Sequence, residues 1–262
     1  EVAAIIREYR LAHEMIPKDL VGSPEVWAAL LDVGIPLTAM IRNLGNMTRL
    51  GVLAPMGAGT ATVIATLGDA SEIRKARVHP LTILTAMKTY AQGHGMKGSG
   101  SWTPLAPVVD ALDRAFYAAF GNVEPTGKRI LLALDVSGSM DSSMIAGSPL
   151  TAREGSAAMV LVTAAVEPNH HIVAFSAPSG YSGGRGVGGQ WGGGTPGMTP
   201  VALSPRMRLD DVVSTLARIP MGGTDCALPM IWALEHKVQA DAFIIYTDSE
   251  TWAGAIHPSQ AL

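Results

Sequence analysis

The sequence has few aromatic side chains, few charges and a single cysteine. Aromatic residues make up 5% of the 262 residues and charged residues 16%, and the net charge is only −3. With Cys226 as its single cysteine, the chain has no intrachain disulfide framework and no cysteine-rich zinc site. So low a cysteine content favours a protein of the reducing cytosol. No apolar run approaches the roughly 20 residues that span a bilayer, and no secretory signal opens the chain. With 48% hydrophobic residues, the chain is expected to fold rather than remain disordered.

Charge is distributed unevenly along the chain. Residues 1–129 contain 13 Lys/Arg against 11 Asp/Glu, whereas residues 130–262 contain 6 against 11. The stretch 42–97 holds seven basic side chains and only two acidic ones, Asp69 and Glu72. Such a stretch can form a phosphate-binding face, although a solvated helical surface is the more common origin of this pattern.

Residues 1–120 follow helical spacing almost throughout. Apolar positions predict helices over residues 2–11, after Ser23-Pro24, over 37–48, from Pro80 onward, and over 104–120. Short helices separated by Gly/Pro turns are typical of a helical-repeat solenoid, but the sequence shows no clean internal period. The natural breaks are residues 93–101 and 121–128.

The periodicity changes after residue 129. Continuous apolar runs predict buried strands at residues 130–134, 172–175 and 243–246. Helical patterns lie between them, at residues 152–166, 209–218 and 226–236, and the first begins with a capping-box pair, Thr151 and Glu154. Strands alternating with helices predict a doubly wound parallel sheet.

In such a sheet, ligands bind beyond the carboxyl ends of the strands. This rule directs attention to Asp135, Ser176 and Asp248. Residues 178–200 include ten glycines between Gly180 and Gly197, and we expect them to form a mobile surface loop.

Oxygen-bearing side chains gather at the predicted sheet edge. Asp135, Ser137 and Ser139 follow the first strand in a D-x-S-x-S pattern, and Thr224 and Asp248 can converge on them from later in the chain. Two carboxylates and three hydroxyls suit one hard cation, Mg²⁺ or Mn²⁺. Direct hydroxyl ligands, with the carboxylates acting partly through water, would leave an open position for an acidic group from a partner.

These residues resemble the metal-ion-dependent adhesion site of a von Willebrand factor A domain. Further segments are similar to the Ro autoantigen family, whose helical part is the TROVE module, and to its prokaryotic Ro/Rsr-type members. They are residues 23–27 (SPEVW), 40–48 (MIRNLGNMT), 76–80 (ARVHP) with 88–90 (KTY), and, in the A domain, 222–230 (GGTDCALPM), 250–254 (ETWAG) and 256–258 (IHP).

The resemblance implies a HEAT-like helical segment followed by an α/β doubly wound A domain. Residues 1–122 would belong to the helical ring and residues 123–262 to the A domain, with the glycine-rich loop at 178–200. It also implies a fragment that begins after most of the helical repeats and ends before the last strands. An opening residue, Glu1, inside a helix-like pattern agrees with this expectation.

The same resemblance implies the partners. Y RNAs would bind the outer ring surface, and single-stranded 3′ ends of misfolded RNAs would enter the central hole. A further partner would be an exoribonuclease that is tethered through RNA. The protein itself would be a monomer in the cytoplasm and would not be an enzyme.

Seven residues are candidates for RNA contact, because they carry the basic character of the helical part. Arg42 and Arg49 lie about two helical turns apart, and Arg74, Lys75 and Arg77 precede a helix N-terminus that can bind phosphate. The full set is Arg42, Arg49, Arg74, Lys75, Arg77, His79 and Lys88. Alternatively, Arg42 and Arg77 are buried partners of Asp69, Glu72 or the A-domain carboxylates.

Enzyme signatures are weak. The G-x-G-x-x-G match at residues 184–189 opens no helix, and Ser137 and Ser139 have no histidine nearby in sequence to act as a base. His170-His171 and Cys226 are more typical of structural positions than of metal or thiol chemistry. The remaining alternative is a protein-binding adhesion or chaperone-adaptor A domain whose metal captures a partner carboxylate.

Overall fold

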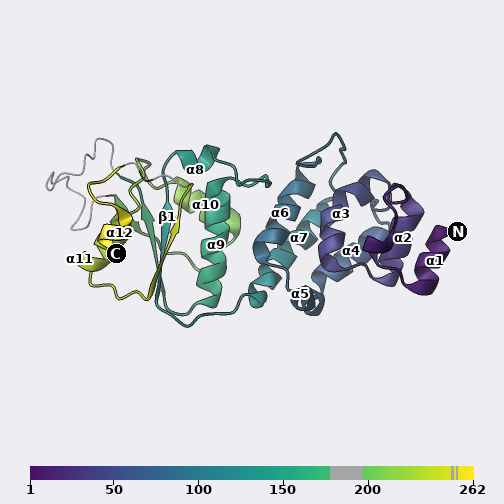
Figure 1. Ribbon diagram of the computed structural model, residues 1–262, viewed down its shortest axis with the longest axis horizontal. Coiled ribbons are helices and arrows are strands. Elements are labelled where there is room, and N and C mark those ends of the chain that lie inside the picture. Colours follow the sequence, from purple (N-terminus) through teal and green to yellow (C-terminus); the bar gives the residue numbers. More distant parts are fainter. Residues whose placement is uncertain (178–196, 249–250, 252) are drawn as a thin grey trace. The chain divides into compact units, whose positions relative to one another are not determined.

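The structure, a computed structural model, describes residues 1–177, 197–248, 251 and 253–262. It divides into two compact units: Glu1–Val123 with Gly147–Pro149, and Glu124–Ala146 with Leu150–Leu262. The first is helical and the second contains strands and helices (Figure 1). Among the helices that the structure describes, none has the length and apolar character needed to cross a bilayer.

The helical unit confirms the helices that sequence spacing predicts. These are α1 Val2–Tyr9, α2 Pro24–Val33, α3 Leu37–Arg49, α6 Pro80–Ala91 and α7 Ala106–Ala118. Two further helices, α4 Ala58–Gly68 and α5 Ala70–Ala76, and two 3₁₀ turns, His13–Met15 and Ala119–Asn122, are additional findings. Helix α4 escaped prediction because its Thr and Gly content lowers helix propensity.

Side-chain caps set the starts of the helices that shape this unit. Ser23 Oγ accepts a hydrogen bond from the Val26 amide at 3.4 Å, and His79 Nδ1 accepts one from the Leu81 amide at 3.2 Å. Both caps are followed by proline at the first helical position, where no amide proton is needed. Helix α6 packs against α3 and α7.

The described residues of the second unit form a four-stranded sheet in the order β3-β2-β1-β4. Strands β1 (Ile130–Asp135), β2 (His170–Phe175) and β4 (Ala242–Tyr246) are parallel, as predicted. The short edge strand β3 (Met198–Pro200) is antiparallel to β2, so the sheet is mixed rather than purely parallel. The three residues of β3 belong to the segment 178–200, which the sequence predicts to be a loop. The rest of that prediction, residues 178–196, lies outside the described residues, as do Ser249, Glu250 and Trp252.

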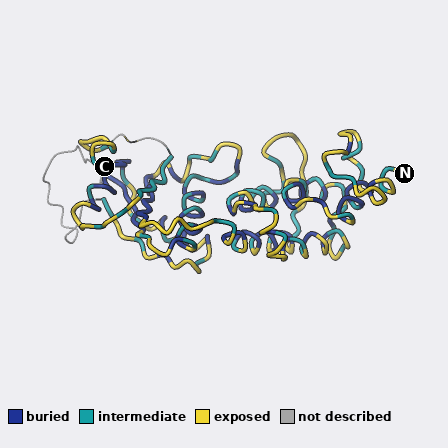
Figure 2. The backbone as a smooth tube through the Cα atoms, turned by 60° about the horizontal axis from the view of Figure 1, so that its bottom comes forward, coloured by how far each residue is buried: buried dark blue, intermediate teal, exposed yellow. Residues whose placement is uncertain are grey.

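Helices cover both faces of this sheet. Helix α9 (Ala152–Val166) packs with α10 (Leu209–Ala217) on one side, and α11 (Leu228–Glu235) and α12 (Pro258–Ala261) lie on the other (Figure 1). Strand β1 is buried along its whole length, which explains its continuous apolar run. Figure 2 shows such buried segments of the backbone between exposed loops. The predicted capping box is confirmed: the Glu154 amide donates to Thr151 Oγ1 at 3.1 Å, and the Thr151 amide donates to Glu154 Oε2 at 3.0 Å.

Cys226 and His170 occupy structural positions in this unit. Cys226 is 9% exposed, in a cluster with Leu131, Phe175 and Trp232, and burial raises the pKa of its thiol. His170 Nδ1 lies 2.7 Å from the Glu167 carbonyl oxygen, at the turn into β2. Both positions agree with the structural role that the sequence favours.

Glu167 gives this unit a pH-dependent contribution to stability. Its carboxylate accepts hydrogen bonds from the Thr126 amide at 2.6 Å and the Gly127 amide at 3.1 Å. These bonds, that of Thr126 above all, lower the pKa of Glu167 below its ordinary value of 4.5. The stabilisation is therefore present above that value and is lost as pH falls through the folded-state pKa.

We expect Glu167→Gln to lower the melting temperature at neutral pH and to have a progressively smaller effect as pH falls below about 4.5. Thermal denaturation of both proteins across a pH series measures this difference. A difference that stays constant from neutral to strongly acidic pH would contradict the assignment.

Candidate functional site

The carboxylate of Asp135 is the centre of a hydrogen-bond network at the carboxyl edge of the sheet. Asp135 ends β1 and is 2% exposed. Its Oδ1 accepts a hydrogen bond from the Ser137 amide at 2.7 Å, and its Oδ2 accepts from Thr224 Oγ1 at 3.3 Å and from Thr247 Oγ1 at 2.8 Å. One buried carboxylate thus joins the turn after β1, the residue after β4 and the loop before α11.

The other predicted oxygens lie beside this network. Ser137 is buried, Ser139 is exposed, and their hydroxyl oxygens are 3.2 Å apart at the start of helix α8 (Ser139–Ser142). Asp248 follows Thr247 directly, is half-buried, and accepts a hydrogen bond from Ser143 Oγ at 2.8 Å. The structure therefore gathers the five predicted residues at one edge of the sheet.

A short backbone pairing places Thr224. Ala177 and Gly223 exchange two amide–carbonyl hydrogen bonds of 2.6 and 2.7 Å. A Cβ at Gly222 would overlap the carbonyl oxygen of Ala177, so only glycine allows this approach. On the other side, the Thr224 carbonyl accepts the Ala253 amide at 3.0 Å.

Asp225 stabilises the loop that carries Thr224. It is 2% exposed, and its Oδ1 accepts a hydrogen bond from the Ala227 amide at 3.0 Å. Burial raises the pKa of Asp225, and the Ala227 hydrogen bond opposes the rise. Asp225 thus anchors the turn that leads from Thr224 into α11.

The donors at Asp135 fit a hard cation. Within the described ranges there is no group of three or more His, Cys, Asp or Glu side chains that could hold a metal, so an ion here would depend on Ser and Thr hydroxyls. Such an all-oxygen set suits Mg²⁺ or Mn²⁺ rather than zinc. The sequence did not single out Thr247 and Ser143 as part of the network; the position of Thr247 beside Asp248, at a strand end, was the available signal.

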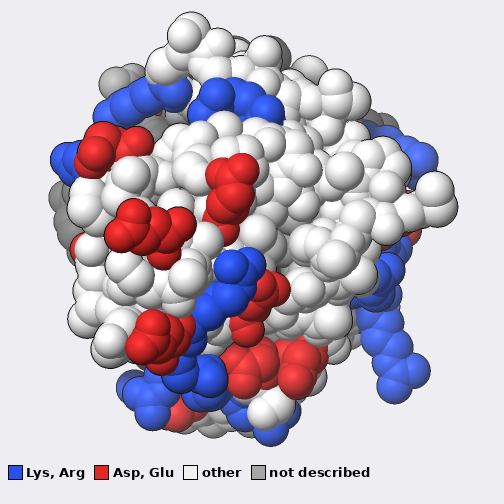
Figure 3. Space-filling view, turned by 90° about the vertical axis from the view of Figure 1, so that its right-hand side faces the viewer, with Lys and Arg blue, Asp and Glu red and all other residues white. Residues whose placement is uncertain are grey.

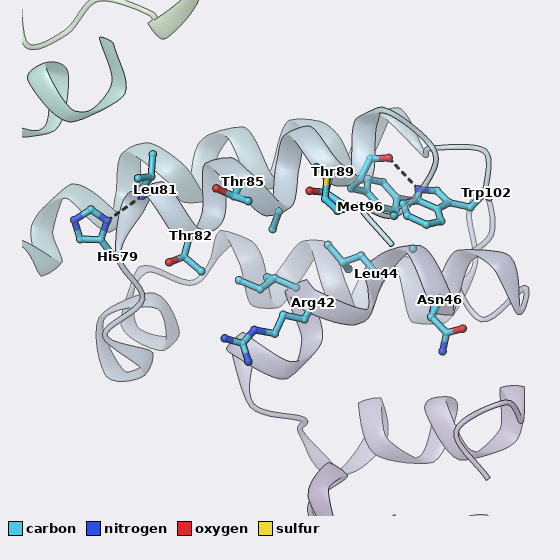
Figure 4. Close-up of a pocket in the computed structure, with 15 residues that line it drawn as sticks. Arg42, Leu44, Asn46, His79, Leu81, Thr82, Thr85, Thr89, Met96 and Trp102 are labelled. Carbon is cyan, nitrogen blue, oxygen red and sulfur yellow. Dashed lines mark hydrogen bonds between the residues drawn. The ribbon is translucent and has the colours of Figure 1, made fainter. Parts of the chain in front are cut away.

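A second candidate site is a groove in the helical unit, between α3, α6 and the segment 95–102. Its volume is about 690 Å³, within the range of small-molecule sites. Arg42 and His79 lie at one end on opposite walls, and Asn46 and Trp102 lie at the other (Figure 4).

The walls of this groove combine hydroxyls with an aromatic ring. Thr82, Thr85 and Thr89 line it from α6. The Trp102 indole donates to the Tyr90 carbonyl at 2.9 Å, and its ring lies directly on the backbone of α3, where a Cβ at Gly45 would come within 2.5 Å of it. The ring is thereby held rigidly at the groove end.

Of the seven candidate RNA residues, two line the groove, Arg42 and His79. The others do not line the groove. Arg49 donates to Asn46 Oδ1 at 2.7 Å, Lys75 pairs with Glu72 at 3.5 Å, and Lys88 is half-buried. Arg74 and Arg77 are exposed near the end of α5.

Arg42 and Arg77 are not buried partners of Asp69 or Glu72, because both side chains are exposed in the helical unit. Arg77 ends α5 in a left-handed conformation with φ 50°, which directs the chain into the turn before His79. Figure 3 looks onto the N-terminal end of the helical unit, where acidic and basic side chains are interleaved. That end is therefore not a continuous basic face.

Comparison with known proteins agrees with both units. A family model described as the Ro60 vWA domain matches residues 129–262, and the TROVE domain model matches residues 10–89. The chain belongs to the Ro60 family. It is 41% identical over 262 residues to the RNA-binding protein RO60 of Deinococcus radiodurans, covering 99% of this chain and 45% of that relative.

Two further comparisons, one with a second relative and one with a solved structure, support the same conclusion. The RNA-binding protein RO60 of Caenorhabditis elegans is 40% identical to this chain over 261 residues. The matched region covers 100% of this chain and 37% of the relative's length. The crystal structure of the Deinococcus radiodurans RO (RSR) protein superposes with a TM-score of 0.85 at 40% identity, covering 99% of this chain and 49% of that one. The chain thus spans less than half the length of these Ro60-family relatives, and the two curated ones are named RNA-binding proteins rather than enzymes.

Proposed function

We propose that this chain supplies a single-stranded RNA-binding groove and a one-ion metal site to a Ro60-type, non-enzymatic RNA-binding protein. The observation that carries the RNA proposal is the groove between α3 and α6, with a cation at one end and an indole ring at the other. The names of the curated relatives support the same ligand class.

The groove offers each kind of contact that single-stranded RNA uses. Arg42 can pair with a phosphate, and the positive end of the α6 helix dipole lies beside His79, which favours an anion there. The threonine hydroxyls can hydrogen-bond to ribose or base edges, and Trp102 offers an apolar surface for a base. Y RNA and the 3′ ends of misfolded RNAs are the ligands that the family resemblance favours, with an exoribonuclease tethered through the same RNA.

The proposed metal site holds one Mg²⁺ or Mn²⁺. Ser137, Ser139 and Thr224 would bind the ion directly, and Asp135 and Asp248 directly or through water. When bound, the ion supplies an electrophilic position that an acidic group of a partner can occupy. Hydrolytic sites commonly use a pair of ions or an activated water, and this oxygen set offers ligands for one ion, so we assign it a binding role.

The RNA proposal is tested by fluorescence anisotropy with a labelled single-stranded oligonucleotide over a salt series. Affinity should fall steeply with salt, because binding to phosphates releases counterions, and should persist in EDTA. Binding that requires Mg²⁺ and ignores salt would instead favour an adhesion domain that captures a carboxylate.

Reversing the charges of Arg74, Lys75 and Arg77 together extends this test to the exposed end of α5. If the three side chains bind phosphates, affinity should fall and the salt slope should shrink by roughly 0.7 for each phosphate that is no longer neutralised. An unchanged salt slope in a folded variant would mean that these residues form an ordinary solvated surface and do not bind phosphates.

A further inference from the structure

Arg153 is a buried guanidinium beside the proposed metal site. It lies in the first turn of α9 and is 2% exposed. Its Nε and Nη2 donate to the two carboxylate oxygens of Asp141, the Nη2–Oδ2 distance being 3.0 Å. The same Nη2 lies 3.4 Å from the carbonyl oxygen of Ser137.

This arrangement is costly for stability alone. Burying a guanidinium requires its desolvation, and pairing offsets this cost only in part because the side chain of its partner, Asp141, is 54% exposed. In addition, Nη1 of Arg153 is buried and has no hydrogen-bond partner among the described residues, which adds an unsatisfied donor. A role beyond packing would account for these penalties.

The hydrogen bonds of Arg153 join three pieces of chain that meet at the metal site. They connect α9 to Asp141 in α8 and to the backbone of Ser137, the middle residue of the D-x-S-x-S turn. The guanidinium is planar and its donors have a rigid fork geometry, so a two-point pair with a carboxylate defines an orientation as well as a distance. Ser139, whose hydroxyl lies 3.2 Å from that of Ser137, lies between the two anchored residues.

Charge supports the same role. The pair of Arg153 and Asp141 has no net charge. The guanidinium therefore does not repel a divalent cation, and the Asp141 carboxylate is not free to bind the ion as a third acidic ligand. Asp135 and Asp248 then remain as the acidic groups of the site. Removing either partner of the pair would change the charge that a divalent cation meets.

We propose that Arg153 is a positioning residue for the metal site: by holding Asp141 and the Ser137 carbonyl, it keeps the Ser137 and Ser139 hydroxyls directed at one ion. This inference rests on the proposed metal site and assigns Arg153 no direct contact with the ion. Partners outside the ligand set that orient ligands typically contribute 10–100-fold to metal affinity.

The test measures metal affinity separately from stability. Mn²⁺ affinity is determined by electron paramagnetic resonance, and Mg²⁺ affinity by competition, at a temperature where every variant is folded; melting temperatures are recorded in EDTA. The variants are Arg153→Lys, Arg153→Met and Asp141→Asn. The matched control is Val160→Ala, a cavity-forming change at a fully buried residue two turns further along α9.

We expect about a 10- to 100-fold loss of Mn²⁺ affinity in the Arg153 variants and a loss of the same direction in Asp141→Asn. Arg153→Lys keeps the positive charge but loses the planar two-point donor geometry of the guanidinium. Its Mn²⁺ affinity should therefore be reduced, as in Arg153→Met. Val160→Ala should melt earlier in EDTA and bind Mn²⁺ as the unmodified chain does.

Three results would overturn the inference, and they differ in what else they overturn. Unchanged Mn²⁺ affinity in Arg153→Lys, with binding by the unmodified chain, removes the role of Arg153 and leaves the metal site standing. An equal loss in Val160→Ala makes the effect one of general stability. Absence of Mn²⁺ and Mg²⁺ binding by the unmodified chain overturns both the inference and the proposed site.

Discussion

Replacing Asp135 by alanine is expected to abolish the stabilisation of this chain by Mg²⁺. An ion that binds only the folded state stabilises it by about 2.7 kcal/mol at a concentration of 100 times its dissociation constant. Asp135 holds the Ser137 amide and the hydroxyls of Thr224 and Thr247, so its removal releases two of the proposed ligands as well as a carboxylate. Thermal denaturation in a Mg²⁺ series and in EDTA measures the difference.

The relevant quantity is the Mg²⁺-induced shift and not the melting temperature itself. Asp135→Ala leaves a buried amide and two hydroxyls without their acceptor, which by itself costs about 1–3 kcal/mol for each unsatisfied group. Asp210→Ala, at an exposed carboxylate on α10 in the same unit, serves as the control and should keep the full Mg²⁺ shift. A Mg²⁺ shift that survives in Asp135→Ala would remove this carboxylate from the proposed site.

Reversing the charge of Arg42 should have the largest effect on RNA affinity of any single change in the helical unit. Arg42 lies at one end of the groove, opposite His79 (Figure 4), and is exposed. A phosphate bound there would lose a charge-assisted hydrogen bond and meet a repelling carboxylate in Arg42→Glu. We expect about a tenfold or greater loss of affinity for single-stranded RNA, and a salt slope smaller by roughly 0.7.

Lys18→Glu provides a matched control for this measurement. Lys18 is exposed in the same unit, does not line the groove, and undergoes the same change of charge. Its variant should lose little affinity and keep most of the salt slope. Equal losses in the two variants would mean that RNA responds to the overall charge of the unit and not to the groove.

Local sequence determined much of the secondary structure and the centre of the metal site. The run 130–134 predicts a strand buried on both faces because it has no polar residue, and β1 is such a strand. A parallel strand directs its last residue to the ligand-binding edge, so Asp135 could be placed from the sequence. Caps such as Ser23 and Thr151 act within three or four residues, which makes them predictable in the same way.

The tertiary structure decided the features that depend on distant residues. Three features join segments far apart in the chain: the antiparallel pairing of β3, the hydrogen bond from Thr247 to Asp135, and the placement of Arg42 and His79 on opposite walls of one groove. The sequence pattern of α9 marks Arg153 as an ordinary charged residue in a first helical turn, yet packing buries it against Asp141 and Ser137. Periodicity reports which face of an element is apolar, whereas packing of one element on another decides which polar groups are buried together.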